Sequence, residues 1–229
     1  MRLLLAPGGV ATIELPHLMR LLDRNQFDTI HHEHYSNFSL RTLQRILSAH
    51  GLTIFDVEEL PIHGGSLRVY AAHADGHGRR ADAGVADLLA REDAAGLTTP
   101  TPYASSAARV QETNRRLLEV LIPINREGKS VVGYGARGKG NTLLNYCGIR
   151  ADRMDYTVDR NLYKQGRFLP GTHIPTAHPS KIAERRLDFI LILPWNLKDE
   201  IIEQPAFGSS RTSFSSSTAT KDSGPRWTP

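Results

Sequence analysis

Titratable side chains crowd into one short segment near the start of the chain, His31-His32-Glu33-His34. Imidazoles titrate near neutral pH, so three of them beside a carboxylate could transfer protons, with Glu33 orienting His34. The same residue types could also bind a metal ion, or could simply form a solvated polar loop. Adjacent residues such as His31 and His32 point in different directions, and the ligand spacings usual for metal sites are absent. The segment therefore favours proton transfer or a solvated loop over a metal site.

A glycine-rich turn with the sequence GYGARGKGNT occupies residues 133–142 and follows an apolar stretch. Its first glycines have the spacing G-x-G-x-x-G, which is typical of dinucleotide-binding turns between a strand and a helix. Glycine there lets a phosphate approach the backbone N–H groups that begin the helix, and Lys139 would add a positive charge. The next predicted strand ends at Asp159, where such folds place an acid that binds ribose. The alternative is a tight strand–helix turn without a ligand.

Two further polar segments are expected near this turn. A basic loop over 160–167 follows Asp159, in the place where open α/β sheets bind their ligands. Trp195-Asn196 ends another apolar strand and could offer a surface for stacking. The plain alternatives are a solvated loop, and a tryptophan that packs at the rim of the core.

The bulk composition excludes several classes of protein. A hydrophobic fraction of 40% over 229 residues is enough for a folded core, so the chain is not wholly disordered. The net charge is +4, and three basic residues against one acidic give the last 22 residues +2, so the body carries no nucleic-acid signal. The single cysteine, Cys147, excludes an internal disulfide, and no apolar run approaches the roughly 20 residues of a membrane span. The apolar start is too short for a signal peptide, so we expect a cytoplasmic protein.

The first elements that position these residues are predicted to be part of an α/β sheet. A strand is predicted over 10–15, with Pro16 in the first turn of the helix that follows. A second helix is predicted from an N-cap at Ser39 to a closing glycine, Gly51. Two more strands are predicted, over 53–60 and 66–73. The resulting β–α–loop–α–β–β order fits the last part of an α/β sheet.

A second set of elements predicts another α/β domain. A short helix over 85–94 leads to a longer one over 104–126, which Pro123 should kink. One helix over 138–147 and three strands are expected to follow, with the strands over 130–133, 154–158 and 187–193. The last strand is almost continuously apolar, as in buried parallel strands. Eleven of the last 22 residues are Ser or Thr, so the end of the chain is expected to be disordered.

These patterns divide the chain into four parts. We expect the C-terminal part of a first α/β domain over 1–76 and a connector with a helix over 77–127. An incomplete Rossmann-like domain is expected over 128–207, and a disordered tail over 208–229.

Several motifs in combination resemble the nucleotide-sugar C-methyltransferases, over roughly residues 3–204. The segments that carry the resemblance are FDTIHHEHYSNFSL (27–40), VEELPIHGGSLRVY (57–70), GYGARGKGNTLLNY (133–146), VDRN with KQGRFLPGTHIP (158–161 and 164–175) and ILPWN (192–196). Proteins of this family contain a small zinc-binding domain, an S-adenosylmethionine-binding domain and a C-terminal Rossmann-like domain that anchors the sugar nucleotide. The resemblance implies that this chain is the C-terminal piece of a class I methyltransferase sheet followed by a Rossmann-like α/β domain.

The resemblance also implies S-adenosylmethionine-dependent methylation of a carbon beside a ketone on a dTDP-linked deoxysugar. A base removes the proton that the carbonyl makes acidic, and the resulting enolate attacks the sulfonium methyl group. The base corresponds to His34, with Glu33 beside it. The third implied catalytic residue is His31, which stands where the family usually has tyrosine and could still donate a hydrogen bond. The implied substrate-binding residues are Gly133, Tyr134, Gly135, Lys139, Asn141, Thr142, Asp159, Trp195 and Asn196.

Two departures from the family accompany the resemblance. The chain starts at what resembles the fifth strand of the methyltransferase domain, so the zinc-ligating cysteines and most of the S-adenosylmethionine site are expected to be absent. After Gln204 the family pattern is expected to stop, without a final Rossmann strand. Such a truncated chain would bind S-adenosylmethionine weakly, which leaves a non-catalytic nucleotide-sugar-binding remnant as one alternative. The glycine-rich turn alone would also fit an NAD-dependent oxidoreductase. No metal ion, nucleic acid or membrane is expected as a partner.

Overall fold

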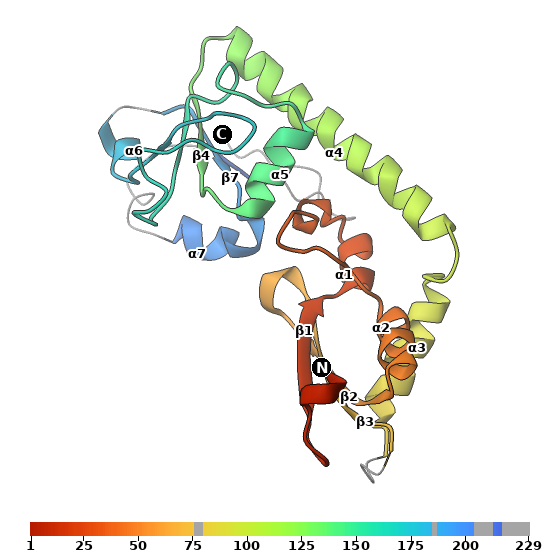
Figure 1. Ribbon diagram of the computed structural model, residues 1–229. Helices are drawn as coiled ribbons and strands as arrows, with labels where there is room; N and C mark the ends of the chain where they lie inside the picture. Colours follow the sequence, from red (N-terminus) through yellow and green to blue (C-terminus); the bar gives the residue numbers. More distant parts are fainter. Residues whose placement is uncertain (76–79, 185–186, 204–212, 217–229) are drawn as a thin grey trace. The chain divides into compact units, whose positions relative to one another are not determined.

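The computed structural model describes residues 1–75, 80–184, 187–203 and 213–216 (Figure 1). Contacts within the chain divide it into two compact units. The first unit comprises Met1–Phe27 and His32–Ala107, and the second comprises Asp28–His31 and the chain from Ala108 onward. The His-rich segment, defined here as residues 28–34, is therefore shared between the two units.

A three-stranded antiparallel sheet in the order β1-β3-β2 forms the first unit. β3 runs antiparallel to both neighbours, with Ala71 opposite Ala11 on one side and Ile54 on the other. β1 and β2 therefore run in the same direction, on either side of a reversed strand. The strands are β1 (Ala11–Pro16), β2 (Leu52–Leu60) and β3 (Ser66–His73). The helices and 3-10 turns of this part of the chain are η1 (Arg2–Leu4), α1 (Leu18–Asp23), η2 (Phe27–Thr29), α2 (Leu40–Ala49), η3 (Ile62–Gly64) and α3 (Ala83–Ala94).

Helices α2 and α3 pack on this sheet (Figure 1). Their apolar residues recur at helical spacing and meet apolar side chains of all three strands. The buried residues of this core are Leu15, Leu40, Leu43, Leu47, Leu52, Ile54, Leu67, Val69, Ala71, Val85 and Leu88. Each of the larger aliphatic side chains contributes roughly 1.5–3 kcal/mol by burial, before conformational entropy is subtracted. This core is the main stabilising feature of the first unit.

The predicted ends of α2 are confirmed. The Ser39 hydroxyl accepts a hydrogen bond from the Thr42 amide at 3.1 Å, as an N-cap does. Gly51 follows the helix with a φ of +70°, which a residue with a side chain rarely adopts. These two caps fix where the helix after the His-rich segment begins and ends.

A buried carboxylate from α3 adds a second cap to α2. The side chain of Glu92 accepts hydrogen bonds from the amides of Leu40 at 2.7 Å and Arg41 at 3.0 Å. These amides belong to the first turn of α2, which has no partners within the helix and attracts negative charge. Glu92 therefore joins the two helices that pack on the sheet.

The prediction for Pro16 was wrong. Pro16 ends β1 opposite Ser66, and α1 begins at Leu18 after His17. β1 is an edge strand, and backbone groups on its open side have no neighbouring strand to bond, so proline, which has no amide hydrogen, is tolerated in such a strand. The missing donor of proline is thus tolerated in the strand as well as in a first helical turn.

A parallel sheet in the order β6-β5-β4-β7-β8 forms the second unit. Every neighbouring pair is parallel, which confirms the predicted buried parallel strand. The strands are β4 (Val131–Tyr134), β5 (Tyr156–Val158), β6 (Thr176–Ala177), β7 (Phe189–Ile192) and β8 (Ser213–Ser216). The helices are α4 (Thr101–Arg126), α5 (Gly138–Tyr146), α6 (Lys181–Glu184) and α7 (Lys198–Ile202), with a 3-10 turn η4 (Trp195–Leu197). The fold class is α/β, as predicted.

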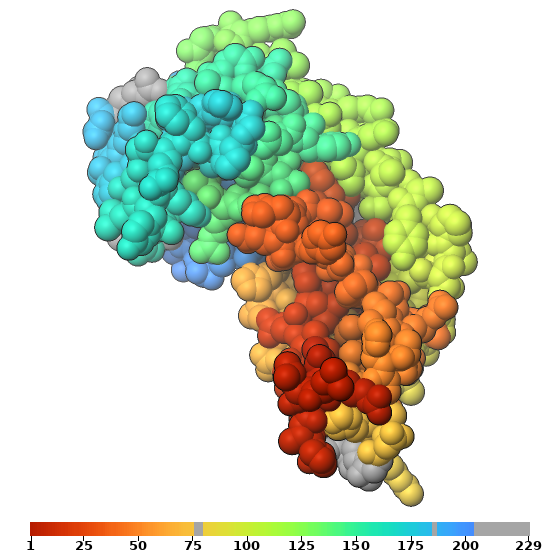
Figure 2. Space-filling view, in the orientation of Figure 1, coloured from red at the N-terminus to blue at the C-terminus, as the bar shows by residue number. Residues whose placement is uncertain are grey.

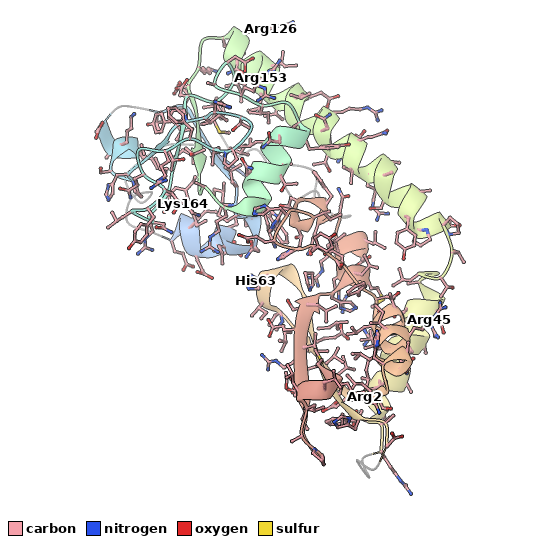
Figure 3. All side chains as sticks on the ribbon, viewed as in Figure 1. Arg2, Arg45, His63, Arg126, Arg153 and Lys164 are labelled. Atoms are coloured by element: carbon pink, nitrogen blue, oxygen red, sulfur yellow. The ribbon has the colours of Figure 1, made fainter. Side chains whose placement is uncertain are left out.

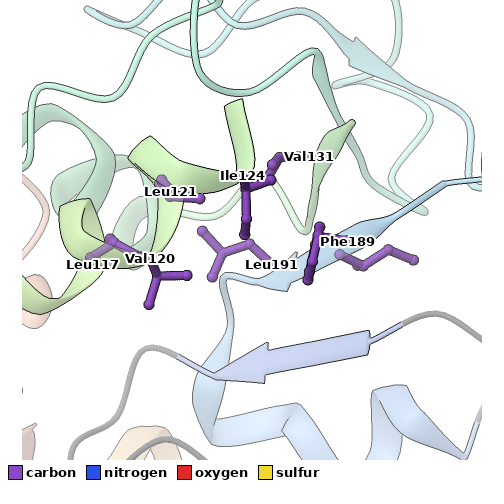
Figure 4. A pocket seen from close by; sticks show the side chains of 8 residues that line it. Leu117, Val120, Leu121, Ile124, Val131, Phe189 and Leu191 are labelled. Carbon is purple, nitrogen blue, oxygen red and sulfur yellow. The ribbon is translucent and has the colours of Figure 1, made fainter. Parts of the chain in front are cut away.

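Apolar packing stabilises the parallel sheet. Ile182 of α6 and Ile201 of α7 share one core with strand residues such as Val132 and Ile192. The C-terminal half of α4 lies against β4 and β7, where a small hollow is lined by apolar side chains (Figure 4). Its lining residues are Leu117, Val120, Leu121, Ile124, Val131, Phe189, Ile190 and Leu191.

The long helix α4 continues past Pro123 to Arg126, so the proline does not end it. Glu119, whose carbonyl loses its helical donor at Pro123, is exposed to solvent. Although α4 has 26 residues, neither it nor any other described helix is apolar enough over a sufficient length to cross a membrane.

The predicted connector over 77–127 is divided between the two units. α3 belongs to the first unit, because Val85 and Leu88 complete the core that α2 and the sheet form. The boundary between the units falls within α4, between Ala107 and Ala108.

Four residues of the predicted disordered tail form a strand. Ser213–Ser216 make up β8 and pair with Phe189–Ile192 of β7. The open edge of a strand can pair with the backbone of any extended segment, so a Ser-rich composition does not exclude this. The expectation that no strand follows Gln204 was therefore wrong. Residues 208–212 and 217–229 of the predicted tail lie outside the described residues, as do residues 204–207 of the predicted Rossmann-like domain.

His17 makes the stability of the first unit depend on pH. Its side chain is 1% exposed, and burial lowers its pKa from 6.5 to about 4, although the nearby Glu59 carboxylate opposes this shift. The folded state therefore holds the imidazole neutral, whereas the unfolded chain protonates it. We expect the full stability above pH 6.5 and a loss of up to about 3 kcal/mol as the pH falls toward 4.

Urea unfolding at several pH values, followed by circular dichroism, measures this loss. In a His17→Phe variant the dependence on pH between the two pKa values should be flatter, because no imidazole has to be protonated on unfolding. His50→Phe, at an exposed position of the same unit, is the control and should keep the wild-type slope. Equal slopes in the wild type and in His17→Phe would contradict this account.

Candidate functional site

Neighbouring parallel strands end on the same side of a sheet, so the carboxyl ends of β4, β5 and β7 lie together. This side of the sheet, where the strands end, is called its carboxyl edge. The glycine-rich turn follows β4, Asp159 follows β5, and Trp195 follows β7 within η4. Open α/β sheets bind their ligands at this edge. The structure therefore brings the predicted substrate-binding residues of three separate segments to one edge of the second unit.

Packing within the protein requires the glycines of this turn. A Cβ atom on Gly133 would lie 2.7 Å from the Thr157 methyl group, closer than real Cβ contacts. Gly135 has a φ of +94°, and a Cβ there would lie 2.7 Å from Pro194. These positions therefore need glycine whether or not a phosphate binds, and their substrate contacts remain predictions.

Asp159 holds the turn and the loop that follows β5. Its carboxylate accepts hydrogen bonds from the amides of Ala136 and Asn161, each at 2.8 Å. The Lys164 ammonium lies 3.6 Å from the same carboxylate and donates to the Ala136 carbonyl at 2.8 Å (Lys164 is labelled in Figure 3). Gln165 donates to the Asp159 carbonyl at 3.0 Å. A ribose bound to Asp159, as predicted, would therefore compete with backbone amides for the same carboxylate.

The loop after β5 also exposes large apolar side chains that the sequence did not single out. Leu162, Tyr163 and Phe168 are 73%, 85% and 65% exposed. The loop lies at the surface of the second unit (turquoise in Figure 2). Large apolar residues within a basic loop, with Leu162-Tyr163 before Lys164 and Phe168 after Arg167, are the signal that could have marked them.

An acidic side chain from the His-rich segment lies against Trp195. The Trp195 indole nitrogen donates a hydrogen bond of 2.7 Å to the carboxylate of Asp28, which is buried. The Lys139 ammonium lies 4.7 Å from the centre of the Trp195 ring, within cation–π range. Two predicted substrate-binding residues, Lys139 and Trp195, are thus brought together by a residue that was not predicted.

Burial shifts both charged groups of this cluster toward their neutral forms. It raises the pKa of Asp28, although the Trp195 hydrogen bond and the charge of Lys139 oppose the shift. It lowers the pKa of Lys139, although Asp28 opposes the shift. Asp28 was missed because an isolated aspartate has no signature in sequence. Its position directly before the histidine cluster, inside a segment that carries the resemblance, was the available signal.

His31 lies against the start of α5. A Cβ atom on Gly138 would lie 3.2 Å from the His31 Nε2 atom and 3.3 Å from its ring carbon. A side chain at position 138 would therefore press on the imidazole. His31 and the glycine-rich turn therefore meet within the second unit, although they are more than 100 positions apart in the sequence.

The remaining predicted residues of the edge have varied surroundings. Tyr134 ends β4 and is buried, which raises the pKa of its hydroxyl. Thr142 donates to the Gly138 carbonyl at 3.0 Å, and the side-chain oxygen of Asn141 is buried with no hydrogen-bond partner among the described residues. Asn196 is half-buried in η4. Their contacts with a ligand stay predictions.

His34 and Glu33 belong to the first unit. His34 is half-buried and Glu33 is exposed, and both lie shortly before the Ser39 cap of α2. In the described parts of the chain, no three His, Cys, Asp or Glu side chains are grouped so that they could hold a metal ion.

Comparison with known proteins identifies the family. A family model described as the C-methyltransferase C-terminal domain matches residues 61–214, which extends beyond Gln204, where we expected the pattern to stop. The chain is 40% identical over 200 residues to the C-methyltransferase NovU of Streptomyces niveus, and the match covers 87% of this chain and 47% of that protein. The chain thus spans about half the length of this curated relative. It belongs to the C-methyltransferase family, of which it contains the C-terminal portion.

Proposed function

We propose that this chain serves the S-adenosylmethionine-dependent C-methylation of a keto-deoxysugar nucleotide. The observation that carries the proposal is the packing of Asp28–His31 at the carboxyl edge of the parallel sheet, with Asp28 on Trp195 and His31 on Gly138. Membership of the C-methyltransferase family supports methyl transfer to carbon. The parallel sheet supports nucleotide binding at its carboxyl edge.

The carboxyl edge suits the anionic part of a dTDP-linked sugar. Lys139 stands in the first turn of α5, where backbone N–H groups and the helix dipole favour an anion. Lys164 adds a second cation from the loop after β5, and the exposed ring of Tyr163 offers a planar apolar surface to the base. These features favour a nucleoside diphosphate over a neutral ligand.

His34 is the proposed base, with Glu33 beside it. Removal of a proton from the carbon beside the ketone leaves an enolate, which is nucleophilic at that carbon. His34 follows His31 by three residues, so trans peptide geometry keeps their Cα atoms within about 11 Å of each other for any arrangement of the units. His31, in the place of the family tyrosine, would donate a hydrogen bond to the substrate.

S-adenosylmethionine would supply the electrophilic methyl group of this reaction. In the described residues, the glycines of the turn after β4 pack against Thr157, Pro194 and Leu193, so this turn offers no open glycine cradle for S-adenosylmethionine, whereas Lys139 at the start of α5 stands where an anion would bind. Nucleotide-sugar binding without catalysis is therefore the second candidate function for the chain by itself. An NAD-dependent oxidoreductase is the weaker alternative, since the Asp159 carboxylate already accepts hydrogen bonds from two backbone amides.

Calorimetric titration with dTDP, S-adenosylmethionine and NAD separates these candidates. We expect dTDP to bind with a dissociation constant in the micromolar range, and the other two at least about a hundredfold more weakly. Lys139→Ala should weaken dTDP binding by about tenfold, because a charge-assisted contact is lost. Lys129→Ala, just before β4 at the opposite edge of the sheet, is the control and should bind normally. Tighter binding of NAD than of dTDP would contradict the proposal.

The role of His34 is measured in a protein with the complete architecture of the family. His34→Ala should lower turnover by at least about a hundredfold, because the proton beside the ketone loses its base. Exchange of that proton with deuterated solvent should disappear in parallel, while dTDP affinity stays within about twofold of the wild type. His50→Ala provides a control at an exposed histidine. Retained exchange in the His34→Ala protein would remove His34 as the base.

A further inference from the structure

The buried carboxylate of Asp28 is the strongest feature that neither the proposed base nor the proposed nucleotide contacts use. Asp28 is 4% exposed, and its burial raises the pKa of the carboxyl. Burying a carboxylate costs free energy unless hydrogen bonds and charges compensate. Trp195 and Lys139 supply that compensation from two different elements, η4 and α5.

The contacts of Asp28 form a chain that ends at a proposed substrate contact. The Trp195 indole N–H points at the Asp28 carboxylate over 2.7 Å, which fixes the orientation of the indole ring. The Lys139 ammonium lies over that ring, 4.7 Å from its centre. The place of the ammonium group therefore depends on Trp195, and the place of Trp195 depends on Asp28.

A second contact, between His31 and Gly138, fixes the C-terminal end of the segment Asp28–His31. The His31 ring lies 3.2 Å from where a Gly138 side chain would begin, one residue before Lys139. Asp28 and His31 thus pack on η4 and on the start of α5, which follow the adjacent strands β7 and β4. Asp28–His31 are held at both ends beside the residue that would meet the diphosphate.

We propose that Asp28 is a positioning residue, which acts through Trp195 to place the Lys139 ammonium for the diphosphate of the substrate. The inference rests on the proposed nucleotide binding and deepens it. Asp28 carries no proton in the reaction and does not touch the substrate. Its carboxylate holds the indole, and the indole holds the cation.

Affinity for dTDP and for inorganic pyrophosphate tests this chain of contacts. Asp28→Ala should weaken both ligands by about tenfold, because Lys139 loses its fixed place. Asp28→Asn keeps an oxygen that accepts from the indole, so it should lose less than about threefold. Trp195→Phe keeps the ring but removes the donor, so it should resemble Asp28→Ala. In a Lys139→Ala protein, Asp28→Ala should have no further effect, since the two changes act on one contact.

A matched control separates positioning from a general loss of stability. Asp188 accepts hydrogen bonds from the amide and hydroxyl of Ser130, at 2.9 Å and 3.0 Å, next to the amino ends of β4 and β7. Asp188→Ala therefore loses two carboxylate hydrogen bonds at the opposite edge of the same sheet, at an exposed position, and should keep wild-type affinity. Equal losses in Asp188→Ala and Asp28→Ala would overturn the inference.

The remaining outcomes distinguish this inference from the proposed function. Wild-type affinity in Asp28→Ala, or losses from Asp28→Ala and Lys139→Ala that simply add, would overturn the role of Asp28 while nucleotide binding stands. If the wild type binds pyrophosphate but not dTDP, the proposed nucleotide substrate fails, and the pyrophosphate affinities of the same variants still decide the inference. If the wild type binds neither, both proposals fail.

Discussion

The hydrogen bond from the Trp195 indole to the Asp28 carboxylate is the interaction on which the candidate site depends. It joins a segment near residue 30 to the end of β7, which lies 167 positions further along the chain. Loss of the donor would remove a hydrogen bond to a buried charged group, which contributes about 1.5–3 kcal/mol, and would leave the backbone amides of Asp28 and Thr29 and the charge of Lys139 as its remaining partners. Asp28 is buried, and Trp195 follows β7 directly in η4, so both partners of this bond lie in well-packed parts of the second unit.

Glycine at a few positions makes this arrangement possible. At the edge of the parallel sheet, the His31 ring, Pro194 and the Thr157 methyl group each occupy the space where a glycine lacks its side chain. The backbone of the β4–α5 turn can therefore approach β5, the residues after β7 and His31 together. The glycine-rich sequence, which suggested phosphate binding, therefore allows close packing of the turn against the rest of the second unit, and Arg137 and Lys139 are the cations that the turn offers to an anion.

Local sequence patterns predicted most helices and strands, but they could not predict contacts between residues that are distant in the sequence. The Ser39 cap, the Gly51 end of α2 and the apolar run of β7 follow from spacing and propensity, and all three are confirmed. Pro16 was misassigned because proline suits both a first helical turn and the end of an edge strand. β8 was missed because backbone pairing at an open edge needs no apolar side chain. Asp28 was missed because its partners, Trp195 and Lys139, are distant in sequence.

The central claim is that Asp28 holds the indole of Trp195, and nuclear magnetic resonance of that indole tests it most directly. With Trp227→Phe in the background, Trp195 is the single tryptophan and gives one indole N–H signal. We expect this signal to lie downfield and to exchange slowly with solvent, because the hydrogen is buried against a carboxylate. Asp28→Ala should move it upfield and speed its exchange. A signal that exchanges as fast as an exposed indole, and that does not change in Asp28→Ala, would contradict the claim.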